Sequence, residues 1–198
     1  GSRARKIELL GDRDATVHTN WSPNNQVIAT YTEAEDLNNQ HLYFVGLNNE
    51  NFRLAVIEGR DFRGQWSPQG DKILYSTYST NTGYRPSLSI ISAQGENIGR
   101  NRKSLKINTW ADKCTFYDNE TIYCAVPLSL REGAGIYPND FDNSATDIYK
   151  IDLRTGYKTR VAIPEGNHNI ESLAVSSNEK YLYFVSKNDG RLYKIQLK

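Results

Sequence analysis

Polar and apolar positions alternate in short runs along this chain, and two of the runs begin with the same tripeptide. Trp-Ser-Pro occurs at Trp21–Pro23 and again at Trp66–Pro68, each time followed by a turn and then by β-branched, aliphatic and aromatic residues. Asn, Gly and Pro favour turns, whereas Val, Ile, Leu and Tyr favour strands. Each copy therefore predicts a strand, a tight turn and a second strand.

The same spacing occurs four times. Seven residues separate Trp21 from Ile28, and the same interval separates the pairs Trp66 and Ile73, Thr115 and Ile122, and Val175 and Leu182. Two further short strands follow in most copies, and four strands per ~40–50 residues is the pattern of a propeller blade. We therefore predict an all-β fold, a β-propeller with four four-stranded blades in one domain over residues 1–198. The predicted blades span about 15–57, 58–105, 106–162, and 163–198 together with 5–10.

The fourth copy contains only three predicted strands. Its missing strand is supplied either by the apolar run Lys6–Leu10 or by a partner chain. Completing a blade in this way removes an exposed strand edge. Three arrangements stay open: a four-bladed ring, half of a ring completed by a second copy in a homodimer, and the last blades of a longer propeller.

The connections between the second and third strands are long in three blades, at 32–40, 79–86 and 127–145. In an antiparallel blade these loops emerge on one face, and binding residues concentrate on loops that a rigid scaffold holds. Loops above ~12–15 residues are uncommon unless they are functional or disordered. We therefore predict a partner-binding surface formed by Tyr84, Arg85, Ile136, Tyr137, Asp140, Phe141 and Asp142.

The two cysteines flank a predicted hairpin. A three-residue loop at 118–120 pairs Tyr117 with Thr121 and places Cys114 directly opposite Cys124. Directly opposed strand residues have Cβ atoms ~4.5–5.5 Å apart, which a disulfide can bridge after local adjustment. Two alternatives remain: a disulfide, which indicates an oxidising compartment, and two buried free thiols.

Charge and motifs exclude several functions. The 24 Lys and Arg balance 23 Asp and Glu without a basic cluster of the kind that nucleic acid requires, and no apolar run reaches the ~18 residues of a membrane span. Catalytic signatures are absent, so we expect no enzyme, no cofactor and no metal site. The alternative is a carbohydrate-binding or hydrolytic site near the central axis, which would use carboxylates. The candidates for it are Asp12, Asp14, Asp61, Asp140 and Asp142.

The repeats at Trp21 and Trp66 resemble the WD40-like (PD40) repeats of TolB-type propellers, although Asn-Asn and Gln-Gly replace the usual Asp-Gly after the proline. The segments Trp110–Cys114, Tyr123–Pro127 and Asp147–Asp152 are similar to uncharacterised bacterial propeller proteins that carry an N-terminal membrane anchor. This resemblance implies an extracytoplasmic location and an anchor that precedes this chain, whose Gly1–Ser2 resembles a tag remnant. It supplies no catalytic residues. We therefore predict a non-catalytic interaction or scaffold module with a protein partner in the cell envelope.

Overall fold

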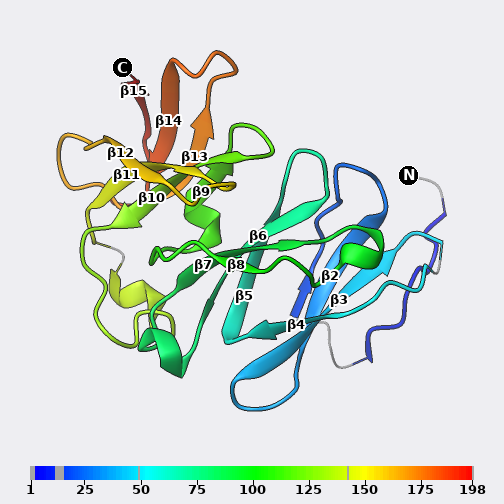
Figure 1. Ribbon diagram of the computed structural model, residues 1–198. Coiled ribbons are helices and arrows are strands. Elements are labelled where there is room, and N and C mark those ends of the chain that lie inside the picture. Colours follow the sequence, from blue (N-terminus) through cyan, green and yellow to red (C-terminus); the bar gives the residue numbers. More distant parts are fainter. Residues whose placement is uncertain (1–2, 12–15, 49, 142, 198) are drawn as a thin grey trace.

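The computed structural model describes residues 3–11, 16–48, 50–141 and 143–197, and their strands form four antiparallel sheets (Figure 1). Gly1–Ser2 lies outside the described residues. The first sheet contains β1 (Val17–His18), β2 (Val27–Ala34), β3 (Asn39–Gly46) and β4 (Ala55–Glu58). The second contains β5 (Arg60–Trp66), β6 (Lys72–Tyr78), β7 (Ser87–Ser92) and β8 (Lys103–Ser104). The third contains β9 (Cys114–Phe116), β10 (Thr121–Pro127), β11 (Thr146–Asp152) and β12 (Lys158–Ala162), and the last contains β13 (Ile170–Val175), β14 (Tyr181–Ser186) and β15 (Leu192–Gln196).

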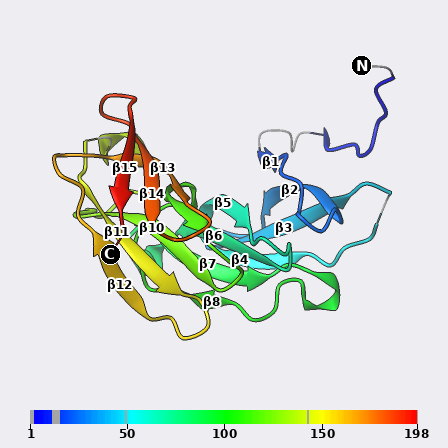
Figure 2. The ribbon, with the colours of Figure 1, turned by 90° about the horizontal axis from the view of Figure 1, so that it is seen from above.

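Each sheet is a meander in which consecutive strands pair. The sheets follow one another as blades, and the first and last sheets lie at opposite ends of the array (Figures 1 and 2). The predicted all-β propeller fold is confirmed. Short 3-10 turns are the helical elements of the described chain, and none of them has the length and hydropathy to cross a bilayer.

The core lies between neighbouring sheets. In β10, Ile122 and Cys124 pack toward the second sheet, whereas Tyr123 and Ala125 pack toward the last one. All four side chains are at most 2% exposed. A strand that is covered on both faces needs apolar residues at consecutive positions, which explains why this run does not alternate with polar residues.

The tight turns of neighbouring blades are joined by side-chain amides. Asn24 Nδ2 donates to the carbonyl of Gly70 across 3.0 Å, and Asn119 Nδ2 donates to Asp71 Oδ1 across 3.1 Å. Because each bond links one blade's turn to the next, these contacts fix the blades relative to one another on this side.

Contrary to the prediction, residues 5–10 do not complete the last blade. These residues form no strand, and Ile7 and Leu10 pack against Ile28 and Val45 of the first sheet. The last sheet contains three strands, and its edge strand β15 lies at the other end of the array (Figures 1 and 2). The apolar run therefore covers the nearest open apolar face instead of pairing with a distant edge.

Candidate functional site

Two of the three predicted loops are docked against each other. The N–H groups of Gly133 and Gly135 donate to the carbonyls of Gly83 and Tyr84, at 3.1 and 2.7 Å. Arg85 Nε donates to the carbonyl of Leu130 across 2.8 Å. The loops at 79–86 and 127–145 therefore form one continuous surface, which we call the docked-loop surface.

Gly135 makes this close approach possible. A Cβ atom at this position would lie 2.5 Å from the Cβ of Tyr78, which is closer than real Cβ atoms come. Any larger residue would clash with the Tyr78 side chain here, so this close approach requires glycine. The loop is thus fixed near its middle to the second blade.

The docked-loop surface presents apolar side chains to solvent. Tyr137 is 65% exposed, Ile136 is 42% exposed, and Leu128 on the same loop is 64% exposed. The other predicted binding residues have partners within the surface. Arg131 contacts both Asp140, at 3.3 Å, and the ring of Phe141, whose centroid is 5.5 Å away.

Tyr84, which is 36% exposed, and Arg85 both have contacts within the molecule. The Tyr84 ring lies edge-on to Tyr78 with its centroid 6.4 Å away, and the Arg85 guanidinium bonds backbone carbonyls. Asp142 lies outside the described residues. The predicted connection at 32–40 is shorter than expected, because β2 extends through Ala34 and β3 begins at Asn39.

A cleft of about 220 Å³ lies beside the docked-loop surface. Its walls come from β5, from the 3-10 turn η4 (Ala111–Lys113), from the turn η5 (Pro138–Phe141) and from β13. Its lining includes Arg63, Trp110, Asp112, Lys113, Phe141 and Glu171. Residues of three blades thus meet at one depression, and η5 forms part of its rim.

Ion pairs and hydrogen bonds cross this cleft between blades. Arg63 contacts the carboxylate of Asp112 in the third blade at 3.0 Å, and also that of Asp61 in its own strand at 3.0 Å. Lys113 Nζ donates to Asn169 Oδ1 and to the carbonyl of Ile170, each at 2.5 Å. The cleft is therefore a polar site of mixed charge with a fixed geometry.

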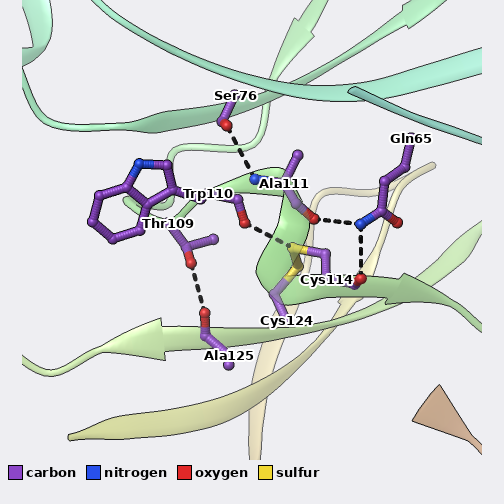
Figure 3. Close-up of a disulfide and its surroundings, with 8 residues drawn as sticks. All are labelled: Gln65, Ser76, Thr109, Trp110, Ala111, Cys114, Cys124 and Ala125. Atoms are coloured by element: carbon purple, nitrogen blue, oxygen red, sulfur yellow. Dashed lines mark hydrogen bonds between the residues drawn. A yellow bond between two sulfur atoms is a disulfide. The ribbon is translucent and has the colours of Figure 1, made fainter. Parts of the chain in front are cut away.

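A disulfide lies beside Trp110, at the wall of the cleft that η4 forms (Figure 3). Cys114 and Cys124 are directly opposite partners in β9 and β10, as the short hairpin loop predicts, and their sulfur atoms are bonded. Gln65 Nε2 donates to the carbonyls of Ala111 and Cys114 at 2.6 and 3.0 Å. These contacts fix the segment immediately before β9 to the second blade.

The described carboxylates of the hydrolytic alternative, Asp61 and Asp140, each pair with an arginine. Asp61 pairs with Arg63, and Asp12 and Asp14 lie outside the described residues. Among the residues that the structure describes, no group of three or more His, Cys, Asp or Glu could hold a metal ion. The carboxylates that line the cleft are instead Asp112 and Glu171, which the sequence analysis did not select.

No family model matches this chain, and no curated protein matches it. Solved structures do resemble it. An uncharacterized protein of Listeria monocytogenes EGD-e is 14% identical with a TM-score of 0.60, and the match covers 92% of this chain and 51% of that one. Hydrazine synthase of Kuenenia stuttgartiensis is 15% identical with a TM-score of 0.58, covering 89% and 51%. TolB of Acinetobacter baumannii is 13% identical with a TM-score of 0.52, covering 90% and 42%.

At these identities the likeness shows the propeller fold alone, because propellers carry both enzymes and interaction modules. The chain spans about half of the length of the Listeria protein and of hydrazine synthase.

Proposed function

We propose that this protein is a non-catalytic protein-interaction module that binds its partner through the docked-loop surface. The observation that carries this proposal is the exposure of Tyr137 and Ile136 on a loop whose backbone is bonded to a second blade. Aromatic side chains at the centre of an interface supply much of its binding energy. A loop that is already ordered loses less conformational entropy when it binds.

The proposal includes an extracytoplasmic location and a protein partner in the cell envelope. The Cys114–Cys124 bond supports this location, because disulfides persist in oxidising compartments and are rare where thiols are kept reduced. The membrane anchor that the family resemblance implies stays a prediction about sequence beyond this chain.

The test begins with capture of partners from a native envelope extract, using this protein as bait. The captured protein is then purified and titrated against the wild type and Tyr137→Ala. We expect Tyr137→Ala to weaken binding at least tenfold, as loss of a buried aromatic anchor does. The matched control is Tyr157→Ala, because Tyr157 is similarly exposed, at 70%, but follows β11 on the opposite side of the same blade.

The control should bind within about twofold of the wild type, as surface substitutions away from an interface do. Equal losses in both variants, or no loss in either, would remove the docked-loop surface from the proposal. Titration of Ile136→Ala against the same partner tests a second exposed side chain of this loop.

The runner-up function is a carbohydrate-binding or hydrolytic site in the cleft. Its support is the pair of carboxylates, Asp112 and Glu171, beside the aromatic ring of Phe141. A glycan array probed with the wild type and Glu171→Gln separates the two functions. A glycan that binds the wild type and is lost in Glu171→Gln would favour this alternative.

A further inference from the structure

A second groove lies between the second and third sheets, separate from the cleft beside the docked-loop surface. Its volume is about 230 Å³. One wall belongs to the second sheet, and the other is formed by the turns that join β9 to β10 and β11 to β12. The rim carries Lys72, Lys103, Glu120 and Arg154, and we call this site the lysine groove. All of its lining residues lie between positions 72 and 154, in the two middle sheets.

The two lysines link the walls of the groove. Lys72 Nζ donates to the carbonyl of Asn119 across 3.2 Å. Lys103 Nζ donates to the carbonyls of Leu153 and Arg154, each at 2.9 Å. Each bond runs from the second sheet to a turn of the third sheet, so both ammonium groups are held in fixed positions between the walls.

These bonds orient the ammonium groups without neutralising them, because a carbonyl oxygen carries no formal charge. Among the described residues, no carboxylate pairs with Lys103, whereas Lys72 has Asp71 at 3.7 Å. An ammonium group has three hydrogens, so Lys103 keeps one donor after its two bonds. Arg154 is exposed and makes no side-chain hydrogen bond or ion pair with another described residue, although its charge reaches Asp152. The lining therefore holds three cations against one carboxylate, that of Glu120.

The groove also has a neutral donor and an apolar base. Ser92 Oγ accepts a hydrogen bond from Asn101 Nδ2 across 3.1 Å. A hydroxyl that accepts one bond keeps its own hydrogen for another acceptor. Ile90, Ile91 and Leu153 line the groove and are each at most 6% exposed, so only their edges reach it.

This set of donors suits an anion with several oxygen atoms. A phosphate group carries a charge of about −1.5 to −2 at neutral pH and has three acceptor oxygens. Lysine and arginine are the side chains that bind such groups, through charge-assisted hydrogen bonds. A carboxylate offers only two oxygens to three cations. The volume of the groove equals that of roughly seven water molecules, which leaves room for a phosphate and a small organic group.

We propose that the lysine groove binds a phosphate monoester. The phosphate lies between the cations of Lys72, Lys103 and Arg154, with the Ser92 hydroxyl as a further donor. A soluble ester and a lipid headgroup present the same group, and the tests below separate these two sources. The turns that form the groove lie at the opposite ends of the strands from the docked loops, so the site is independent of the proposed function.

The first test titrates the wild type with inorganic phosphate and follows the backbone amide resonances by NMR. We expect saturable shifts at Ser92, Asn101 and Arg154. Sodium chloride at equal ionic strength is the control, because salt screens exposed charges without occupying a site. Shifts that do not saturate, or that chloride reproduces, overturn the proposal.

Two substitutions on the rim have opposite expected effects on the dissociation constant for phosphate. Arg154→Gln removes a cation and should weaken binding about fivefold, the upper range for an exposed charge pair. Glu120→Gln removes the opposing carboxylate and should strengthen binding about two- to threefold. Neither side chain bonds another described residue, so both variants should keep the fold.

Arg191→Gln is the matched control. Arg191 is also an exposed arginine, but it precedes β15 in the last sheet. The control should bind phosphate as the wild type does. Equal weakening in Arg154→Gln and Arg191→Gln would mean that phosphate responds only to net charge, which overturns the site. Weaker binding in Glu120→Gln overturns it as well.

Two esters then identify the source of the phosphate. Glycerol phosphate represents a soluble ligand, and vesicles that contain phosphatidic acid represent a headgroup. Tighter binding of glycerol phosphate than of inorganic phosphate supports the soluble ligand. Sedimentation with the vesicles that is lost in Arg154→Gln supports the headgroup. Binding of neither ester overturns the proposal.

Discussion

The backbone N–H of Gly135 donates to the carbonyl of Tyr84, and this 2.7 Å bond joins the longest loop of the third blade to the second blade. The bond lies between residues about fifty positions apart in the chain, and it holds the segment that presents Ile136 and Tyr137. A long loop that is tied in its middle behaves as two short ones, because each half has less freedom to lose. The exposed side chains are thereby kept in a fixed arrangement.

Gly135→Ala should release this loop. The new Cβ would lie 2.5 Å from Tyr78 Cβ, so either the loop or the tyrosine must move. We expect a loss of about 1–3 kcal/mol in the free energy of unfolding, as overpacking of a close contact usually costs. Limited proteolysis should cut the variant between 128 and 145 sooner than it cuts the wild type.

Gly95→Ala is the control for this experiment. A Cβ at Gly95 meets nothing within 4 Å, so the substitution adds only the strain of a left-handed backbone, at φ of 53°. It should leave cleavage within the loop unchanged. Equal cleavage of the two variants in this loop would show that Gly135 does not hold it.

Removing the disulfide should destabilise the third blade. The bond closes a short loop between residues that are 10 positions apart, and the chain-entropy estimate for such a loop is about 2–3 kcal/mol. Denaturant unfolding of the oxidised and reduced wild type measures this difference directly. Intact mass should rise by about two daltons on reduction as two hydrogens are added. An unchanged unfolding midpoint would contradict the stabilising role.

The turn of the last blade gives a prediction about pH. Lys150 donates to Glu179 Oε1 across 2.5 Å, and the hydroxyl of Tyr123 donates to the same oxygen. The hydrogen bond from Lys150, followed by the one from Tyr123, lowers the pKa of Glu179 below its usual value of 4.5. A lowered carboxyl pKa stabilises the fold above the usual value, and this contribution is lost as pH falls through the lowered pKa.

Glu179→Gln tests this assignment. At neutral pH the wild type should be more stable by about 1 kcal/mol, because a partly exposed charged pair is screened by solvent. The difference should shrink toward zero as pH falls below 4.5, where the glutamate gains its proton and resembles glutamine. Unfolding curves of both proteins across this range measure it. A difference that is constant with pH would place the stabilisation elsewhere.

The repeated strands were predictable because their signal is local. Seven-residue spacing after Trp21 and Trp66, with turn residues between apolar runs, specifies a strand pair without knowledge of the rest of the chain. The pairing of Cys114 with Cys124 in the ladder was predictable for the same reason, since a three-residue loop sets the register of a hairpin.

The contacts between blades were not predictable in this way. Asp112 and Asn169 approach the same cleft only because η4 and β13 belong to blades that pack side by side. The apolar run at residues 6–10 fits either a strand edge or an open sheet face, and its composition does not choose between them. The hydrogen bond from Arg85 to the carbonyl of Leu130 was likewise not predictable, because Leu130 lies on another loop.

The two repeat tryptophans should respond differently to the same substitution. Trp66 packs on Phe44 and donates to Asn20, so Trp66→Ala removes an inter-blade contact. Because Trp66 is only half-buried, the expected loss is about 2–3 kcal/mol, below the range for a fully buried tryptophan. Trp21→Ala should change the free energy of unfolding of a single chain by less than about 0.5 kcal/mol, as exposed substitutions do. Denaturant titration at low protein concentration measures both values. Equal losses for both variants would contradict this difference, because they would mean that Trp21 makes a contact within the chain as strong as that of Trp66.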